Sequence, residues 1–438
     1  MKHLIKHICI LLLVLPFAGF AQKDSTLTYQ QAIEIALKNN YDIQIAKNNV
    51  SIADKQNTYG AAGFLPRVDA LASGSFASNS THQEFSTGAA SVNKDGVTSN
   101  AVSSGVYLTW TVFDGLKMFA TKERLQQLEE QGQYALKIQI ENTIQQVTLS
   151  YFEIVKQQQL IRGILAAKAV SDERIKIADK KLSVGSGSNV DLLQAKLDMN
   201  AQRSQLLTEQ NNLNEYKSNL LTLLKMDPFS TVTVDSNFTF ESVKSVDEIK
   251  QTIEKTNNSI LFAQKNVSVY NQYIKEVRSQ ALPKLALTAN YLFGRNENSA
   301  GFTLLNQNLG YNLGFTFSWN LYNGWNTHNQ ITVAQYQLQN SILNVESLKL
   351  NMYSTANVAY LKWLGNKQIL DLEEENIKLA EESLKITTER LRIGLGSSIE
   401  IIESQQSYED AITRLVNARY NVKESEVALK KLTGELVK

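Results

Sequence analysis

Cysteine, proline and histidine are scarce in this chain. Its 438 residues include 1 cysteine, 4 prolines and 4 histidines. Cys9 lies inside an apolar run near the start of the chain, so we expect neither a disulfide nor a lipid anchor on a mature N-terminal cysteine. The prolines stand at positions 16, 66, 228 and 283, and the stretches between them leave room for very long helices.

Long hydrophobic runs are absent beyond the N-terminus. Lys2 and Lys6 precede an apolar run from Ile8 to Phe17, which ends in small residues up to Ala21. This order is typical of a cleaved signal peptide, so we predict that residues 1–21 are removed and that 22–438 form the mature protein. No other stretch approaches the ~20 apolar residues of a transmembrane helix.

Charge of one sign and catalytic motifs are lacking as well. The chain has 44 basic and 43 acidic residues, a formal net charge of +1 that argues against nucleic acid as a partner. His82 and His328 are the histidines left after the signal, and neither has metal-ligand spacing to Cys, Asp or Glu. No phosphate-binding loop or nucleophile elbow occurs. The sequence therefore predicts no enzyme, no metal site and no cofactor.

Three motifs occur twice in the chain. The first copies are Leu65-Pro66-Arg67, Trp110-Thr-Val-Phe113-Asp-Gly115 and Leu182-Ser-Val-Gly185-Ser-Gly187-Ser188; the second copies are Leu282-Pro283-Lys284, Trp319-Asn-Leu-Tyr322-Asn-Gly324 and Leu391-Arg-Ile-Gly394-Leu-Gly396-Ser397. The last two motifs return at a common shift of 209 residues, and the Leu-Pro motif returns at 217. These spacings predict two structural repeats, about 26–226 and 246–434.

Each repeat contains two segments in which apolar and polar residues alternate. The clearest is Tyr311–Leu321, and weaker ones are Val68–Phe76, Val106–Val112 and Leu285–Phe293. Such alternation predicts strands with one apolar and one polar face. We expect strands within about 67–113 and 284–322, paired as hairpins with long polar loops at 79–104 and 294–308.

The strands have two interpretations, a half-buried hairpin of a soluble domain or a hairpin whose apolar face meets lipid. Aromatic residues at both strand ends favour the second, because outer-membrane barrels carry aromatic girdles at the membrane interface. These residues are Trp110, Phe113, Trp319, Tyr322 and Trp325. Four strands are too few to close a barrel without leaving edges in lipid. Copies must therefore share a barrel, and three copies would supply twelve strands.

Residues 116–184 and 325–393 lack proline, so each segment is predicted to form one helix ~100 Å long. Ile140, Ile144, Val147 and Tyr151 have the spacing of a coiled-coil seam. Shorter helices at 188–226 and 246–282 would line one long helix, and those at 397–434 and 28–64 the other, with a β-like stretch at 231–240. The predicted fold class is an α+β membrane protein, with a long antiparallel α-helical coiled-coil barrel and four transmembrane β-strands per subunit.

The opening run Leu27–Asn40, the Leu-Pro-basic triplets, the Trp boxes and the Gly-x-Gly turns together resemble the TolC family of outer-membrane efflux proteins. The resemblance covers residues 26–434. It implies a homotrimer whose twelve-stranded barrel, embedded in outer-membrane lipid, continues into a helical periplasmic tunnel, with 227–245 in an equatorial region. It also implies an exit duct of a tripartite efflux or type I secretion system. Its partners would be a periplasmic adaptor (membrane fusion) protein and an inner-membrane pump of RND, ABC or MFS type.

The resemblance further implies that two helix-turn-helix tips close the periplasmic entrance and contact the adaptor. The docking turns would carry Gly185, Gly187, Gly394 and Gly396. At such turns we expect a positive φ, which glycine adopts without strain.

The acidic ring of the family matches Glu400 and Glu403, with Asp191 at the equivalent place in the first tip. Threefold symmetry would stack these acids as a pore gate around the axis. They also suit solvated positions in the first turn of a helix, and that alternative stays open.

Two other classes of protein share parts of this pattern. A periplasmic coiled-coil adaptor or scaffold would show a signal peptide and heptads, but it needs no aromatic-flanked strands. A secreted enzyme with a helical insertion would need a catalytic constellation, which the sequence lacks. The transported substrate is not predicted.

Overall fold

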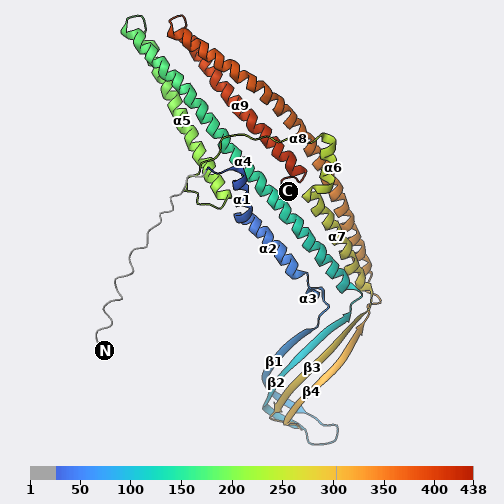
Figure 1. Cartoon of the computed structure of the whole chain (residues 1–438). Helices are drawn as coiled ribbons and strands as arrows, with labels where there is room; N and C mark the ends of the chain where they lie inside the picture. Colours follow the sequence, from blue (N-terminus) through green and yellow to red (C-terminus); the bar gives the residue numbers. More distant parts are fainter. Residues whose placement is uncertain (1–25, 302, 438) are drawn as a thin grey trace, which may run out of the picture. The chain divides into compact units, whose positions relative to one another are not determined.

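The computed structural model describes residues 26–301 and 303–437 (Figure 1). The predicted signal peptide, residues 1–21, lies outside this part of the chain. The described residues form two compact units. Unit 1 contains residues up to 40, 144–241 and 363–427, and unit 2 contains 41–143, 242–362 and the residues from 428 onward.

Two long helical hairpins make up much of the chain. Helices α4 (Lys117–Ser183) and α8 (Asn326–Arg392) have 67 residues each, and α5 (Asn189–Leu223) and α9 (Ser398–Leu432) have 35 each. The two longest are single helices, as the lack of proline predicts. In residues 26–301 and 303–437, no helix has an 18-residue stretch apolar enough to cross a membrane.

The shorter helices are interrupted where the sequence pattern predicts continuous ones. The prediction is wrong at Asn40, between α1 (Tyr29–Asn39) and α2 (Tyr41–Gln56), and at Asn257, between α6 (Val246–Thr256) and α7 (Asn258–Arg278). The two segments end in α3 (Tyr59–Ala62) and the 3-10 turn η1 (Ser279–Ala281). Asn40 and Asn257 have ψ of 132° and 112°, outside the helical range.

Asn40 and Asn257 each bind the end of another helix. Asn40 Nδ2 donates to the carbonyl oxygen of Leu223, the last residue of α5, at 3.1 Å. Asn257 Nδ2 donates to that of Leu432, the last residue of α9, at 3.0 Å. The last carbonyls of a helix have no donor within the helix, so these bonds satisfy them. Helices α5 and α7 do both contact α4, as predicted, through Gln157–Glu209 and Arg124–Glu276. The predicted end-to-end partners are wrong, because α5 ends at Asn40 of segment 28–64 and α9 ends at Asn257 of segment 246–282.

The largest core of unit 1 lies where α1, α4 and α5 meet. Val147, Tyr151 and Phe152 of α4 pack there with Leu220 of α5. The hydroxyl of Tyr151 donates to the carbonyl of Leu27 at 3.1 Å. Burial raises the pKa of Tyr151 to about 12, so its hydroxyl stays protonated and remains a donor.

The connection between α5 and α6 is irregular rather than β-like at 231–240, so that prediction is wrong. Its one recorded bridge pairs Val234 with Leu27. Lys423 Nζ donates to the carbonyl of Thr239 at 2.8 Å and lies 3.0 Å from Glu426 in a buried ion pair. The buried ion pair Lys423–Glu426 of α9 thus holds this segment, whereas a strand would be held by backbone hydrogen bonds to a neighbouring strand.

Unit 2 holds a four-stranded antiparallel sheet in the order β1-β2-β3-β4 (Figure 1). The strands are β1 (Arg67–Gln83), β2 (Val92–Phe113), β3 (Lys284–Asn298) and β4 (Leu305–Ser318). The prediction of long loops at 79–104 and 294–308 is wrong, because most of these residues lie in the four strands. The hydrogen bonds between strands use the backbone alone, and Ser, Asn and Thr can occupy a strand face that meets water. The polar composition of these segments was therefore no evidence for a loop.

The two faces of the sheet differ in chemistry. Residues opposite each other share a face, and successive rows alternate between faces. One row is Ala70, Val106, Tyr291 and Tyr311, and the next is Asp69, Tyr107, Asn290 and Asn312. The apolar face along β4 carries Leu309, Tyr311, Leu313, Phe315 and Phe317, each more than 60% exposed. The register thus confirms strands with one apolar and one polar face.

The tryptophan of each Trp box binds the Leu-Pro segment of its own repeat. Trp110 Nε1 donates to the carbonyl of Phe64 at 2.9 Å. Trp319 Nε1 donates to the carbonyl of Ala281 at 3.0 Å. Each tryptophan therefore links the end of one strand, β2 or β4, to the segment that precedes the neighbouring strand, β1 or β3.

The end of each Trp box makes the turn from a strand into a long helix. Gly115 and Leu116 have φ of 72° and 69°, and Gly324 and Trp325 have 67° and 64°. Two consecutive left-handed residues reverse the chain, and glycine takes the first position without strain.

Gly115→Ala should destabilise the protein more than Gly324→Ala. Both positions have positive φ, which costs alanine about 1 kcal/mol. A Cβ at Gly115 would also lie 2.5 Å from the carbonyl oxygen of Ser279, whereas Gly324 has nothing within 4 Å. Thermal unfolding followed by circular dichroism should show a loss of about 1 kcal/mol for Gly324→Ala and a larger loss for Gly115→Ala. Equal losses would show that the close approach to Ser279 is relaxed at no cost.

Candidate functional site

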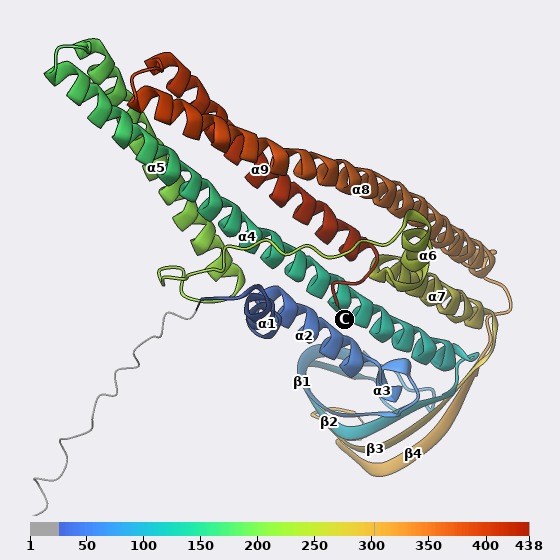
Figure 2. The ribbon, with the colours of Figure 1, turned by 45° about the horizontal axis from the view of Figure 1, so that its top comes forward.

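In unit 1 the two hairpins lie side by side in the order α5, α4, α9, α8 (Figure 2). The side-chain contacts that fix this order are Gln157–Glu209 between α4 and α5, Ser171–Gln405 between α4 and α9, and Glu373–Arg414 between α8 and α9. Helices α5 and α8 are therefore the flanks of the row. Both hairpin turns lie at the same end of the row.

The glycines of the two turns have different functions. Gly185 and Gly394 have φ of 75° and 81°, as predicted. Gly187 and Gly396 lack a positive φ, so the prediction is wrong for them. A Cβ at Gly187 would lie 2.8 Å from Lys181 Cβ, and one at Gly396 would lie 2.8 Å from the backbone nitrogen of residue 391. The first glycine of each turn adopts the left-handed backbone conformation, and the second allows the turn to pack closely against the end of the preceding helix.

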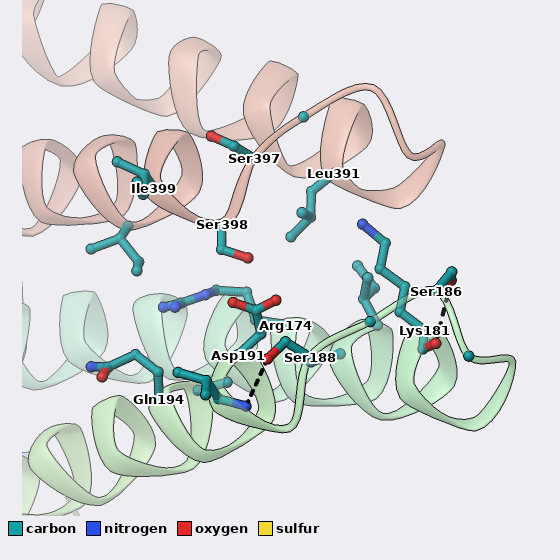
Figure 3. A pocket seen from close by; sticks show the side chains of 18 residues that line it. Arg174, Lys181, Ser186, Ser188, Asp191, Gln194, Leu391, Ser397, Ser398 and Ile399 are labelled. Carbon is teal, nitrogen blue, oxygen red and sulfur yellow. Dashed lines mark hydrogen bonds between the residues drawn. The ribbon is translucent and has the colours of Figure 1, made fainter.

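A cavity of about 720 Å³ lies between the two turns (Figure 3). Lys181, Ser186 and Asp191 line it from the first hairpin, and Leu391 and Ile399 line it from the second. Both turns contribute backbone to its rim, through Gly185 and Gly396 among others. The cavity therefore belongs to both repeats and has a mixed polar and apolar lining.

Arg174 forms a buried wall of this cavity. Its side chain is 6% exposed and donates to Asp198 Oδ2 at 2.9 Å and to Gln405 Oε1 at 3.3 Å. Gln405 Nε2 in turn donates to Ser171 Oγ at 2.9 Å and to Glu409 Oε1 at 3.0 Å. The network joins α4, α5 and α9, and the two carboxylates compensate the buried guanidinium. Sequence reasoning missed these residues, because the partners of Arg174 are 24 and 231 positions away and no motif marks them.

The predicted gate residues do not meet within one subunit. Asp191 lines the cavity, but Glu400 and Glu403 do not. Glu400 Oε2 lies 3.6 Å from Arg390 Nε, while the Glu403 side chain is exposed. Across residues 26–301 and 303–437, no group of three or more His, Cys, Asp and Glu side chains could hold a metal ion. Their role as a gate stays a prediction that depends on symmetry-related copies.

The five predicted interface aromatics lie at one end of the sheet, where the strands join the helices. Trp110 pairs in register with Leu287, near the start of β3, and Trp319 directly follows the end of β4. Tyr322 and Trp325 are 74% and 66% exposed, whereas Phe113 is half-buried. The expectation of these aromatics at both strand ends is therefore wrong, and the five residues mark a single level.

A family model described as "Outer membrane efflux protein" matches residues 32–224 and 250–435. Outer membrane protein TolC of Escherichia coli is 21% identical over 356 residues, which cover 78% of this chain and 71% of that protein. Outer membrane efflux protein BepC of Brucella suis is 21% identical over 428 residues, 95% of this chain and 87% of that protein.

Solved structures share the fold. The CmeC outer membrane channel of Campylobacter jejuni superposes with a TM-score of 0.77 at 19% identity, covering 93% of this chain and 85% of that one. The outer membrane protein VceC of Vibrio cholerae gives 0.73 at 16% identity, covering 93% and 96%. The predicted fold class is thereby confirmed.

Proposed function

Because the chain belongs to the outer membrane efflux protein family, we propose that it works as a trimeric channel, the exit duct of a tripartite efflux or type I secretion system. It would receive substrates from an inner-membrane pump through a periplasmic adaptor and release them outside the cell. The predicted family is confirmed, and with it the location in the outer membrane. The alternative of a periplasmic adaptor or scaffold is not supported, because the family match covers both repeats.

The sheet of unit 2 is the observation that carries this proposal. Its edge strands β1 and β4 each pair on one side only within the described chain. Unpaired edges are unfavourable in lipid. Pairing β4 of one copy with β1 of the next removes the edges. Three copies would form a twelve-stranded barrel with the apolar face toward lipid and the Asn- and Ser-rich face toward a water-filled interior.

The protein extracted in detergent from the outer-membrane fraction should be a heat-modifiable trimer that conducts ions across planar bilayers. Trimer formation is expected because it pairs every strand edge. Gel mobility with and without boiling, together with single-channel recording, tests both properties. A monodisperse monomer with full β content by circular dichroism would contradict the proposal.

The two Gly-x-Gly turns support a docking role for the tips. Gly185 and Gly394 have nothing within 4 Å of an added Cβ, so a partner can approach the backbone there. The cavity between the turns offers polar and apolar groups from both repeats. We assign these turns to the periplasmic adaptor, and the type of pump, RND, ABC or MFS, is left open.

Replacing Gly185 and Gly394 together by valine should abolish efflux while trimer content and surface level stay unchanged. Valine at positive φ strains the turn, and its side chain projects from an open site toward the partner. Gly88→Val is the matched control, because Gly88 also has positive φ and nothing within 4 Å, but lies between β1 and β2. Drug resistance of cells that carry the cognate pump and adaptor is the readout. Normal resistance in the double variant would argue against docking at these turns.

The acids of the second tip support a cation-selective gate. Glu400 and Glu403 are three residues apart on α9, so they share a helix face. In a trimer they would form two rings of like charge, where weak screening strengthens attraction for cations. Arg390 offsets Glu400 in part, so Glu403 should contribute more.

Glu400→Gln with Glu403→Gln should lower cation preference and weaken block by multivalent metal ions from the periplasmic side, by roughly tenfold. Glu403→Gln alone should have a larger effect than Glu400→Gln alone, and Arg390→Gln should raise cation preference. Helix propensity changes little between Glu and Gln, so folding should survive. Recordings in planar bilayers test this order. Wild-type selectivity and block in the double variant would show that these carboxylates do not face the pore.

A further inference from the structure

Few charges lie on the polar face of the sheet. The register places on this face the odd-numbered residues of 67–79 and 97–111 and the even-numbered residues of 284–298 and 306–318. The charged ones among them are Arg67, Asp69 and Lys284, and the others are neutral, with many Asn, Ser, Thr and Gly. All three charges lie where β1 and β3 begin, at the end of the sheet that joins the helices (Figure 1). The polar face is thus charged at this end and neutral beyond it.

Arg67 and Lys284 hold equivalent places in the two repeats. Each follows the proline of a Leu-Pro motif and is the first residue of a strand. Each also stands three residues after the carbonyl group that the tryptophan of its repeat binds, Phe64 in the first repeat and Ala281 in the second. Matching hydrogen bonds therefore fix the start of both hairpins, and the register turns both basic side chains toward the polar face.

The register also accounts for the levels of the two basic residues. Arg67 aligns through Thr109 with Thr288, which lies four residues along β3 from Lys284. In a barrel the strands tilt, and the rows of paired residues climb around the axis. An offset between hairpins is therefore expected when their equivalent residues lie at the same height. Three copies would then place six basic residues, three Arg67 and three Lys284, at the end of the barrel that joins the helices.

The two repeats differ in the acid that accompanies the basic residue. Asp69 follows Arg67 by two positions on the same face, and its Oδ2 lies 2.7 Å from Arg67 Nε. The corresponding residue of the second repeat is Ala286. Lys284 is exposed and forms no ion pair within residues 26–301 and 303–437. The first repeat thus carries a neutral pair at this level, and the second repeat carries a net positive charge.

We propose that Lys284 points into the lumen of the barrel and that the three copies form an anion-binding ring there. This inference rests on the proposed trimeric channel and adds a class of solute that the barrel attracts. Rings of Lys or Arg side chains are how pores select anions and phosphate. The ligands are multivalent anions, or cargo with phosphate, sulfate or carboxylate groups, because an ammonium group acts on them as a point charge.

Block of single-channel current by inorganic triphosphate tests the ring. Triphosphate is added from the outer side, so that it reaches the ring through the barrel without passing the predicted acidic gate. Lys284→Gln should weaken the block by about tenfold, because the ring then has no net charge. Ala286→Asp should weaken it as well, although Lys284 remains, because the change recreates the ion pair of the first repeat.

Two further variants separate the charge of the ring from a structural defect. Asp69→Asn should strengthen the block, because it leaves Arg67 without its carboxylate and doubles the number of free cations in the ring. A merely structural defect would not strengthen binding. Arg295→Gln is the control, because Arg295 is an exposed basic residue of the same strand on the apolar face, in register with Val102. It should leave the block unchanged.

The accessibility of introduced cysteines tests the orientation of Lys284 directly. Cys9, in the predicted signal peptide, is the only native cysteine, so an introduced thiol can be modified selectively. Lys284→Cys should react with sulfonatoethyl methanethiosulfonate, a water-soluble and negatively charged thiol reagent, and the current should fall in up to three steps. Leu285→Cys, the adjacent position on the apolar face, should give no change in current.

The outcomes separate this inference from the proposed function. A conducting trimer in which Lys284→Gln and Ala286→Asp are blocked like the unaltered protein would overturn the ring and leave the channel standing. A response from Leu285→Cys alone would also overturn the ring, because it would place Lys284 outside the lumen, near the phosphates of lipid headgroups. Failure of the unaltered protein to form a trimer or to conduct would overturn the channel itself.

Discussion

The helical architecture depends on the side-chain amides of Asn40 and Asn257. They bind the C-terminal ends of α5 and α9, where these helices stop within the length of the protein. Helices α5 and α9 each stop with carbonyl groups that their own residues cannot bind. Asn40 and Asn257 supply donors to Leu223 and Leu432. Asn257 also accepts the first N–H groups of α7. A buried carbonyl left without a donor would cost about 1–3 kcal/mol at each end.

The two repeats share local backbone structures and hydrogen bonds more than they share side chains. Thr28 and Ser245 are both N-caps with a capping box, completed by Gln31 in one repeat and Glu248 in the other. The Trp boxes make the same hydrogen bond from indole to helix end in both repeats. The two repeats thus share short motifs at fixed spacing, while the sequence between the motifs differs.

The sequence predicted the elements whose signals are local, and it failed where the decisive partner is distant. Absence of proline located α4 and α8 to within a residue or two. Polar composition was mistaken for loops, because strand pairing over 79–83 and 92–104 is stabilised by the opposite backbone. The break at Asn257 could have been found, since Asn257 follows Asn40 by 217 residues, the shift of the Leu-Pro motif. The tip glycines carried a local signal, whereas the network around Arg174 carried none.

The two tips have the same backbone turn but different charge, and this difference limits what a partner can recognise. Both tips place two basic residues before the turn, Lys180 and Lys181 in the first and Arg390 and Arg392 in the second. After the turn the first tip has Asp191, and the second has Glu400 together with Glu403. In a trimer, six turns of one shape would alternate by one acidic side chain, because Glu403 of the second tip corresponds to Gln194 of the first. Shape alone would give a docking partner six equivalent positions, and the extra carboxylate of Glu403 would distinguish three of them from the other three. In the proposed docking, the duplicated fold would set the geometry of the contact, and the divergence of the repeats would set its stoichiometry.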